Sequence, residues 1–472
     1  MTARATTSAM VPAFCLMVAI VYSTPGAVMA KDAPSPKLPE IDGVRLIHVE
    51  DPDLGVVAVE VVVEAGSLHD PPRKEGLADL AAHMLLRGTR TRTYQQIMDQ
   101  VNDLGATLDA AAQKEFFLLS GDFMPRYQDR FAAILADVLA NPTFPADEFE
   151  QERSLAIEDI RNVRNDDAEL ARHFFARYLY RGHPLGRPTR GYLSALAGMK
   201  ASDCADFWRA HVRRGNLVVV LAGAIDRAAA ERFVRAITAG VPAGARERQD
   251  QPPPPKPKGL RILVVDKPER TQTQVVIGRP SLHWRSPDLF GLLVGNTAFG
   301  GTFTARLMRE IREKRGWSYG ASSSITAGRQ FGTQAIRFFP ANKDTVPAIE
   351  VTLGLLRDVM DKGLEPAEVE FARNHIANQF PFRLETARKR ADETLADVIF
   401  DRPADFVKTY VANVRKQTRA TVNRAISKWY DADDLVVTVV ATAADLVPEL
   451  KKLPGVTAID VVPYDTDELP PL

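Results

Sequence analysis

Residues 61–69 read Val-Val-Val-Glu-Ala-Gly-Ser-Leu-His, and residues 275–283 read Val-Val-Ile-Gly-Arg-Pro-Ser-Leu-His. The shared Ser-Leu-His endings are 214 positions apart. A second pair of similar apolar runs, residues 216–221 and 434–439, is 218 positions apart. Two anchors with nearly the same offset indicate an ancient internal duplication. We therefore expect two homologous domains of similar size.

A proline-rich stretch lies between the two copies, over residues 246–259 with the sequence RERQDQPPPPKPKG. Four consecutive prolines followed by Lys-Pro-Lys exclude a helix or a central strand and favour an extended, semi-rigid linker. The sequence thus predicts an N-terminal domain over residues 31–245 and a C-terminal domain over residues 260–472.

Each half mixes short β-branched runs with longer helical patterns. In the first half the pattern predicts two strands and four helices. The strands are expected over residues 57–64 and 116–121, and the helices over residues 75–86, 94–104, 146–164 and 168–180, the last with Asp167 as N-cap. Since strands and helices do not alternate strictly, the pattern favours an α+β fold. We expect each domain to have an antiparallel-type sheet with one face covered by helices.

The first thirty residues have the features of an exported protein. Arg4 is the only charge before Lys31, an apolar stretch covers residues 10–22, and Val28 and Ala30 form a V-x-A pattern. This arrangement predicts a secretory signal peptide over residues 1–30, cleaved after Ala30, and hence a periplasmic protein. The apolar stretch is shorter than the roughly 20 residues of a membrane span, and we expect no span in the mature chain.

The composition argues against nucleic-acid binding and limits what cysteine can do in this chain. The 60 basic and 60 acidic residues balance, so there is no overall basic field that would hold nucleic acid. Cys15 lies in the predicted signal peptide, which leaves Cys204 as the single cysteine of the mature chain. An internal disulfide and a cysteine-based metal site are therefore excluded. We expect Cys204 to be a buried, inert thiol.

Residues 75–89 read EGLADLAAHMLLRGT. This segment closely resembles the motif helix of the pitrilysin/insulysin and mitochondrial processing peptidase family of zinc metallopeptidases. Active members of that family carry H-x-x-E-H there, within G-L-A-H-x-x-E-H-M-x-x-x-G-T. Here the flanking residues are shared, but Asp79 stands at the first histidine position and Ala82 at the glutamate position. Only the second histidine remains, as His83.

The substitutions remove the chemistry that the family motif supplies. Histidines at i and i+4 share one helix face and can hold a Zn²⁺ ion, and the glutamate between them acts as general base. Ala82 cannot accept a proton. The resemblance places the third zinc ligand at Asp159 and an upstream glutamate at Glu152. We expect no zinc and no catalytic residue in this chain, with an Asp79–His83–Asp159 metal site as the alternative.

A second motif lies in the other half, where residues 312–320 read REKRGWSYG after a helix expected over residues 305–314. It resembles the second-domain signature of the same family. That resemblance implies that Arg312 and Tyr319 hydrogen-bond the substrate backbone, and a guanidinium and a phenol suit a peptide carbonyl. The alternative is a solvated helix end with basic residues near its C-terminus, stopped at Gly316.

Two shorter segments also match the family. Residues 182–186 read Gly-His-Pro-Leu-Gly, which resembles a family loop. Gly300-Gly301 is either a plain turn or a flexible loop that lets substrate backbone come close. The resemblance covers residues 44–462 and rests on four separated motifs in the family's order.

The family includes heteromeric members in which one subunit carries the zinc motif and the other does not. The resemblance therefore implies a non-catalytic, substrate-binding subunit of a periplasmic heteromeric zinc metallopeptidase. Its partner would be a homologous H-x-x-E-H subunit that holds the zinc, and its substrates would be peptides or unfolded segments. Two alternatives stay open: a peptide-binding or scaffolding protein without peptidase activity, and a solitary metallohydrolase that uses the Asp-substituted site.

Overall fold

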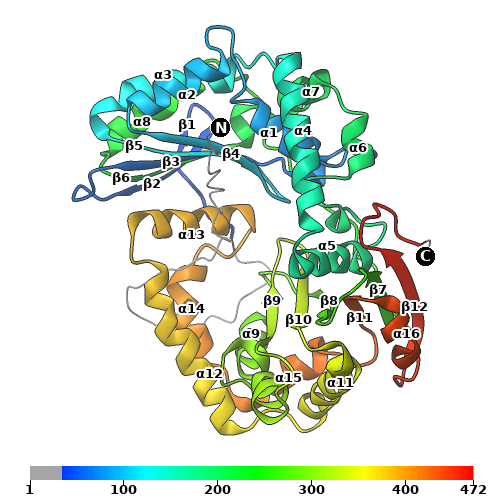
Figure 1. Cartoon of the computed structure of the whole chain (residues 1–472). Coiled ribbons are helices and arrows are strands. Elements are labelled where there is room, and N and C mark those ends of the chain that lie inside the picture. Colours follow the sequence, from blue (N-terminus) through cyan, green and yellow to red (C-terminus); the bar gives the residue numbers. More distant parts are fainter. Residues whose placement is uncertain (1–33, 471–472) are drawn as a thin grey trace.

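The computed structural model describes residues 34–470, so the predicted signal peptide lies outside the described residues. Each half of the chain forms a six-stranded sheet packed by helices (Figure 1). The predicted α+β fold with two domains of the same build is thereby confirmed. Within the described residues, none of the helices is long and apolar enough to cross a bilayer.

The first sheet has the strand order β1-β2-β6-β3-β5-β4. Strands β2 and β6 are parallel, and every other neighbouring pair is antiparallel. The strands are β1 (Glu40–Ile41), β2 (Val44–Glu50), β3 (Val57–Val63), β4 (Thr107–Ala112), β5 (Phe117–Phe123) and β6 (Leu217–Gly223). Strands β1 and β4 form the two edges.

The second sheet repeats this plan in the order β12-β7-β11-β8-β10-β9. Here β12 and β11 both run parallel to β7. The strands are β7 (Leu260–Asp266), β8 (Gln274–Ser281), β9 (Ala321–Thr326), β10 (Gly332–Phe338), β11 (Val436–Ala441) and β12 (Val456–Pro463). Both sheets are therefore mixed, because β6 lies parallel to β2 in the first half, and β11 and β12 lie parallel to β7 in the second.

The first half contains the helices α1 (Leu77–Met84), α2 (Tyr94–Asp103), α3 (Gln128–Ala140), α4 (Ala146–Val163), α5 (Asp167–Leu179), α6 (Leu193–Ala197), α7 (Ala201–His211) and α8 (Arg227–Thr238). The four helices predicted in the first half agree with α1, α2, α4 and α5 to within a few residues, and the structure adds four helices that were not predicted. The predicted N-cap Asp167 is wrong by one residue. Asp166 caps α5 by accepting the N–H groups of Ala168 and Glu169 at 2.8 and 2.9 Å. Asp167 is the first helical residue and pairs instead with Lys267.

The second half contains the helices α9 (Leu289–Asn296), α10 (Arg306–Met308), α11 (Thr345–Asp361), α12 (Pro366–Gln379), α13 (Ala387–Ile399), α14 (Phe406–Arg415), α15 (Arg419–Trp429) and α16 (Ala443–Leu450). The helix predicted over residues 305–314 is not uniform. Its first turn is α-helical, and Arg309–Lys314 form a wider π-helix. A second π-helix covers Thr297–Gly301. Such turns are rare and occur often at functional sites.

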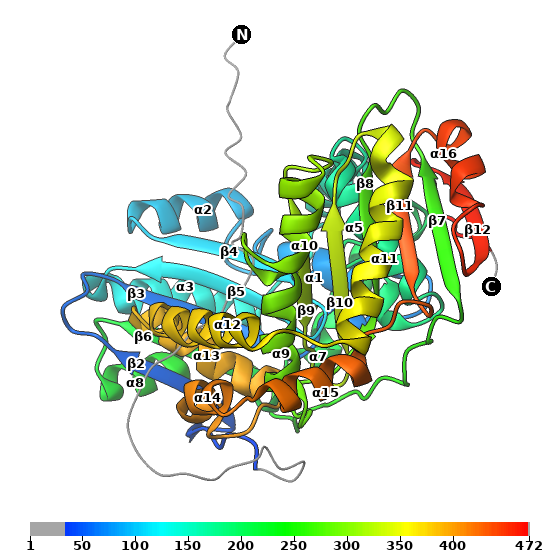
Figure 2. The same ribbon diagram turned by 90° about the horizontal axis from the view of Figure 1, so that it is seen from below.

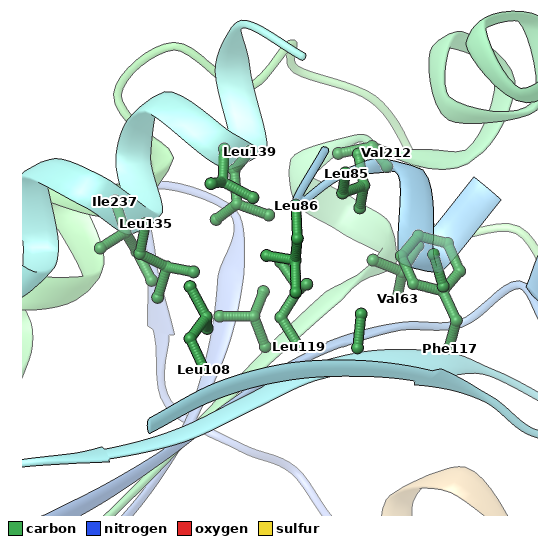
Figure 3. Packing of buried hydrophobic residues seen from close by; sticks show 14 of the residues in the cluster. Val63, Leu85, Leu86, Leu108, Phe117, Leu119, Leu135, Leu139, Val212 and Ile237 are labelled. Atoms are coloured by element: carbon green, nitrogen blue, oxygen red, sulfur yellow. The ribbon is translucent and has the colours of Figure 1, made fainter. Parts of the chain in front are cut away.

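Packing of the first domain core follows the alternation of its strands. Figure 3 shows Leu135 and Leu139 of α3 above Leu108 and Leu119 of the sheet, with Ile237 of α8 beside them. In the second domain, α9, α11 and α15 cover the equivalent face of the sheet, which Figure 2 views from the side of α11. Cys204 of α7 lies in the first core as a free thiol, and burial raises its pKa to about 12. The expected buried thiol is thus confirmed.

The remaining face of each sheet is covered by a helix from the other half. Helix α5 packs on β8 and β11 of the second sheet, and α13 packs on β2 and β6 of the first (Figure 1). Their buried faces include Phe174 and Phe175 on α5 and Leu395 and Val398 on α13. The prediction of one covered face is therefore wrong, because strands that are apolar on both sides must be buried on both sides.

The proline-rich stretch carries neither helix nor strand over residues 246–258. It is nevertheless held by both halves. His183 of the Gly-His-Pro-Leu-Gly loop bonds the Pro252 carbonyl through Nε2 at 2.7 Å, while its Nδ1 accepts the N–H of Leu185. On the other side, the N–H of Gln251 donates to Gln330 at 2.8 Å. The loop that resembles the family sequence therefore fixes the path of the linker.

Candidate functional site

Helix α1 is positioned by its own N-terminal turn. Asp70 accepts hydrogen bonds from the N–H groups of Gly76 and Ala78, both at 2.8 Å. Gly76 has φ +99°, and a side chain there would come within 2.6 Å of the Arg190 carbonyl. Glycine at this position therefore allows the start of α1 to pack directly against the loop that carries Arg190.

Asp79 and His83 lie one turn apart on α1, and both have partners within the protein. The Nδ1 atom of His83 donates to the Asp79 main-chain oxygen at 2.9 Å. The Asp79 carboxylate accepts the N–H of Ala112, the last residue of edge strand β4. Burial raises the pKa of Asp79, while His83 and Arg190 act in the opposite direction. Asp79 thus terminates the strand edge where the family has a zinc ligand.

Ala82 stands at the position of the family's general base. Its side chain is fully buried within the first domain core. A methyl group in this place can neither accept a proton nor orient a water molecule.

Asp159 and Glu152, both on α4, have separate partners. The Asp159 side chain is 55% exposed, and its Oδ2 lies 3.8 Å from the Arg190 guanidinium. Glu152 is buried and forms an ion pair with Arg87, which also stacks over the Tyr94 ring at 4.0 Å. Glu152 therefore anchors α4 to the end of α1.

These residues do not fit a zinc ion. Among residues 34–470, no three His, Cys, Asp or Glu side chains are grouped closely enough to hold a metal. Arg190, which the sequence reasoning missed, contributes a positive charge beside Asp79 and Asp159 instead. No sequence signal identified it, because it lies in a loop and reaches the site only through the packing around Gly76.

Arg312 has a different environment in the second half. Its guanidinium stacks over the ring of Phe303 at 4.3 Å, and Phe303 is 60% exposed. The neighbouring cations each have a carboxylate partner, because Arg309 pairs with Glu368 and both Lys314 and Arg315 pair with Glu310. Within the described chain, the Arg312 guanidinium has no carboxylate partner.

Tyr319 is 83% exposed, and its hydroxyl has no hydrogen-bond partner among the described residues. Its loop is nevertheless ordered. The preceding Gly316 ends the helix with φ +65°, and Ser318 Oγ donates to the Gly320 carbonyl at 2.7 Å and accepts the N–H of Phe339. The fold therefore presents this phenol to solvent on a fixed loop.

Gly300 has a packing role. A side chain at this position would come within 2.6 Å of the Ser323 Cβ atom on β9. Glycine is thus required for the close approach of the π-helix to the strand, whereas Gly301 is exposed. Within residues 34–470, the structure shows no hydrogen bond, ion pair or ring contact between Arg312 or Tyr319 and the motif positions on α1 and α4. The two groups form separate regions of one chain.

The fold and the motif positions together define a two-domain protein of the zinc-metallopeptidase type whose metal motif is altered. Residues 45–192 match the family "Insulinase (Peptidase family M16)", and residues 199–376 match "Peptidase M16 inactive domain". The chain belongs to the M16 (insulinase/pitrilysin) family and carries both of its domain types.

Similar curated proteins include uncharacterized zinc proteases of two bacteria. That of Mycobacterium leprae is 28% identical over 341 residues, covering 71% of this chain and 75% of the relative. That of Bacillus subtilis is 21% identical over 352 residues, covering 74% of this chain and 84% of the relative. Both comparisons cover most of each protein.

Solved structures share the fold at lower identity. A peptidase M16 inactive domain from Pseudomonas fluorescens aligns with a TM-score of 0.77 at 21% identity, covering 92% of this chain and 99% of that chain. A protease from Helicobacter pylori aligns with a TM-score of 0.75 at 17% identity, covering 87% and 99%. A chain in the Complex III2 structure from Candida albicans aligns with a TM-score of 0.70 at 14% identity, covering 88% and 99%.

Proposed function

We propose that this chain is the non-catalytic, substrate-binding subunit of a heteromeric zinc metallopeptidase. Its partner is a homologous chain with an intact H-x-x-E-H motif, which holds the zinc. The complex acts in the periplasm on peptides or unfolded segments. The observation that carries this proposal is the contrast between a buried Ala82 at the general-base position and two groups of the second half, a half-buried Arg312 without a carboxylate partner and an exposed Tyr319.

The first half supports a role without metal chemistry. The Asp79 carboxylate already accepts a main-chain N–H, and Asp159 lies beside the Arg190 guanidinium. A zinc ion would have to displace both contacts and would still lack a general base next to its bound water. The proposal therefore assigns the zinc to the partner and none to this chain.

The second half supports a role in holding substrate. A guanidinium is always charged and offers several donors, and the flat Phe303 ring beneath Arg312 restricts how it can turn. The Tyr319 hydroxyl adds a donor on an ordered loop. Two such groups can bond successive carbonyl oxygens of an extended peptide, or the oxyanion that forms when the partner's metal-bound water attacks.

Peptide main chain can also add to a sheet edge, which gives affinity with little sequence preference. Strands β4 and β9 are edge strands of the two sheets. On β4, the N–H of Ala112 is already bonded to Asp79, which shortens the edge that a peptide could use beside the altered motif. We therefore expect the cleaved peptide to bind between this chain and its partner, and not along β4 alone.

The similar proteins favour an assembly over a solitary enzyme. The curated relatives are named zinc proteases, whereas this chain lacks two of the three motif residues. A chain of the Complex III2 structure shows that the fold also occurs within a multi-chain assembly.

The decisive test uses the native complex, isolated from the source organism through a tag on this chain. The partner is identified by mass spectrometry, and turnover of an unstructured fluorogenic peptide is measured. We expect Arg312→Ala to lower kcat/KM at least about tenfold, equal to about 1.4 kcal/mol, while the complex still assembles. Arg309→Ala is the matched control, because Arg309 lies in the same helical segment but is paired with Glu368.

Equal turnover by the Arg312→Ala complex and the control complex would contradict the substrate-binding role. A complex that contains no H-x-x-E-H partner and turns over no peptide would favour the scaffolding alternative. Turnover by this chain alone, lost on His83→Ala, would favour the solitary metallohydrolase.

A further inference from the structure

A cleft of about 380 Å³ opens between α5 and the loop over residues 186–191. It adjoins the altered metal motif, because Arg190 on its rim contacts Asp159. Its lining carries five cationic side chains and a single carboxylate: Lys114, Arg172, Arg177, Arg187, Arg190 and Glu169. In a chain with no net charge, this is a strong local excess of positive charge.

Two of these arginines are partly neutralised by carboxylates around the cleft. Arg187 lies 3.9 Å from Glu75, and Arg190 lies 3.8 Å from Asp159. Lys114 donates to the Arg187 carbonyl, and burial lowers its pKa to about 8, so it is mostly charged at neutral pH. The charge of the cleft is therefore reduced at its rim but is not cancelled.

Arg177, one of the lining residues, is only 4% exposed yet has no carboxylate within ion-pair distance in the described chain. Its guanidinium donates to the Asp467 main-chain oxygen, lies 3.3 Å from the Nε2 atom of His173 and packs on the rings of Phe174 and Tyr192, whereas its Nε atom has no hydrogen-bond partner. Since arginine only donates, His173 must accept through Nε2, which leaves its proton on Nδ1. Burial, followed by Arg177, lowers the pKa of His173 to about 3, so the ring is neutral and cannot supply a negative charge.

Arg172 is exposed one turn earlier on α5, and it makes no ion pair, hydrogen bond or ring contact within residues 34–470. Arg337 of the adjacent strand β10 is close enough for the two charges to repel each other. Burial, followed by this repulsion, lowers the pKa of Arg337. Like charges left this close without a counter-ion raise the free energy of the protein, and an anion bound between them lowers it.

The equivalent helix of the other half provides an internal comparison. Helix α13 also covers the opposite sheet, and its cations are neutralised. Arg388 pairs with Glu60 and with Asp392, and Arg402, just beyond the helix, pairs with Glu393 at 2.7 Å. The arginines in and beside α13 therefore each have a carboxylate within ion-pair distance. Of these two helices, only α5 has arginines without a carboxylate partner.

The C-terminal segment of the chain lies beside the cleft and shows one kind of group that the cleft arginines bind. Residues 464–470 read YDTDELP and follow β12 beside α5, beginning with a turn at Tyr464 and Asp465 (Figure 1). Arg164 and Arg177 donate to the main-chain oxygens of Asp465 and Asp467. An acidic segment therefore already lies beside Arg177 of the cleft through a main-chain bond, while no carboxylate of that segment pairs with Arg172.

We infer that this cleft binds the carboxylate groups of acidic peptides and so selects acidic segments as substrates. This inference rests on the proposed peptide-binding role and specifies its substrate class. The carboxylate comes either from Asp and Glu side chains or from a peptide C-terminus, since both offer the same bidentate acceptor to a guanidinium.

The test measures binding of short labelled peptides to the purified chain by fluorescence anisotropy. A Glu-rich peptide is compared with its Gln-substituted and Lys-substituted counterparts, each with a free and with an amidated C-terminus. We expect the Glu-rich peptide to bind at least about tenfold more tightly than the Gln peptide, and this ratio to fall as salt rises from about 50 to about 500 mM. Retention of the preference by amidated peptides assigns it to side chains, and its loss assigns it to the C-terminus.

Arg172→Glu is the informative variant, because Arg172 is exposed and without partners, so the fold does not depend on it. We expect it to reduce the Glu-over-Gln ratio at least about fivefold. Arg232→Glu makes the same charge change at an exposed, unpaired arginine on α8 and should leave the ratio within about twofold. Arg172→Lys should retain most of the preference, because it retains the charge.

Equal binding of the Glu and Gln peptides, or equal effects of Arg172→Glu and Arg232→Glu, would overturn the inference. The proposed function would survive either result, since it rests on turnover by the complex and on Arg312. If Arg312→Ala left turnover unchanged while the preference for acidic peptides held, the proposed role of Arg312 would be wrong. The inference that the cleft binds acidic peptides would still stand.

Discussion

The two halves of this protein share one fold but use their motif residues differently. In the first half, Asp79, Glu152 and Asp159 each contact a partner within the chain. In the second half, Arg312 rests on an exposed ring and Tyr319 points into solvent. Polar groups with internal partners stabilise a fold, whereas groups held in place without partners are available to a ligand. The comparison therefore predicts opposite consequences for mutations in the two halves.

The largest expected effect concerns Glu152. Glu152→Ala leaves the half-buried Arg87 without its main partner and should lower the free energy of unfolding by about 3 kcal/mol, measured by urea denaturation. Glu150→Ala is the matched control, because Glu150 lies on the same helix in an exposed pair with Arg153 and should cost less than about 1 kcal/mol. Equal effects of the two variants would break the distinction drawn for the first half.

A smaller effect, dependent on pH, is expected at Asp79. Burial raises the pKa of this carboxyl in the folded state. The folded protein therefore binds more protons than the unfolded chain between the ordinary and the raised pKa, and the contribution of Asp79 to stability is lost as pH rises through the raised pKa. Asp79→Asn keeps an acceptor for the Ala112 N–H and does not titrate.

The stability of Asp79→Asn relative to the natural chain should thus increase as pH rises above the ordinary pKa of an aspartate, and a mildly acidic and a neutral pH are compared. Urea denaturation at both pH values measures it. A relative stability that stays constant or decreases with pH would show that Asp79 is held as a free carboxylate, as a metal ligand would be.

The smallest effect on stability is expected at Tyr319. Because its side chain is 83% exposed and unpaired, Tyr319→Phe should change the free energy of unfolding by less than about 0.5 kcal/mol. In the native complex it should lower kcat/KM for peptide several-fold, through loss of one hydrogen-bond donor. A marked loss of stability with normal turnover would place Tyr319 with the structural residues of the first half.

Much of the fold could be predicted from local patterns. The duplication follows from two repeated segments at nearly the same offset, and the α+β fold and four of the first-half helices follow from apolar periodicity, which is set by neighbours in sequence. The exchange of α5 and α13 between the sheets could not be predicted in this way, because periodicity shows that a helix has an apolar face and not which sheet it covers. A signal was present in β6, where residues 217–223 are apolar throughout and buried on both faces.

The positions of the candidate sites could be predicted from the sequence, but some of the residues that contribute to them could not. The resemblance gave the positions of Asp79, Ala82 and Asp159, because they lie at fixed spacings on helices. Arg190 could not be found, since it comes from a loop and meets the motif only through tertiary packing around Gly76. The lack of an ion pair at Arg177 could not be predicted either, because ion pairing depends on distances that the sequence does not contain.

The central claim is that the metal chemistry resides in a partner and the substrate-binding groups in this chain. Zinc content of the purified chain, stripped with chelator and resupplied with Zn²⁺, tests it most directly. The account predicts about zero zinc per chain, because Asp79 and Asp159 hold other partners. About one zinc per chain, lost on His83→Ala, would contradict it.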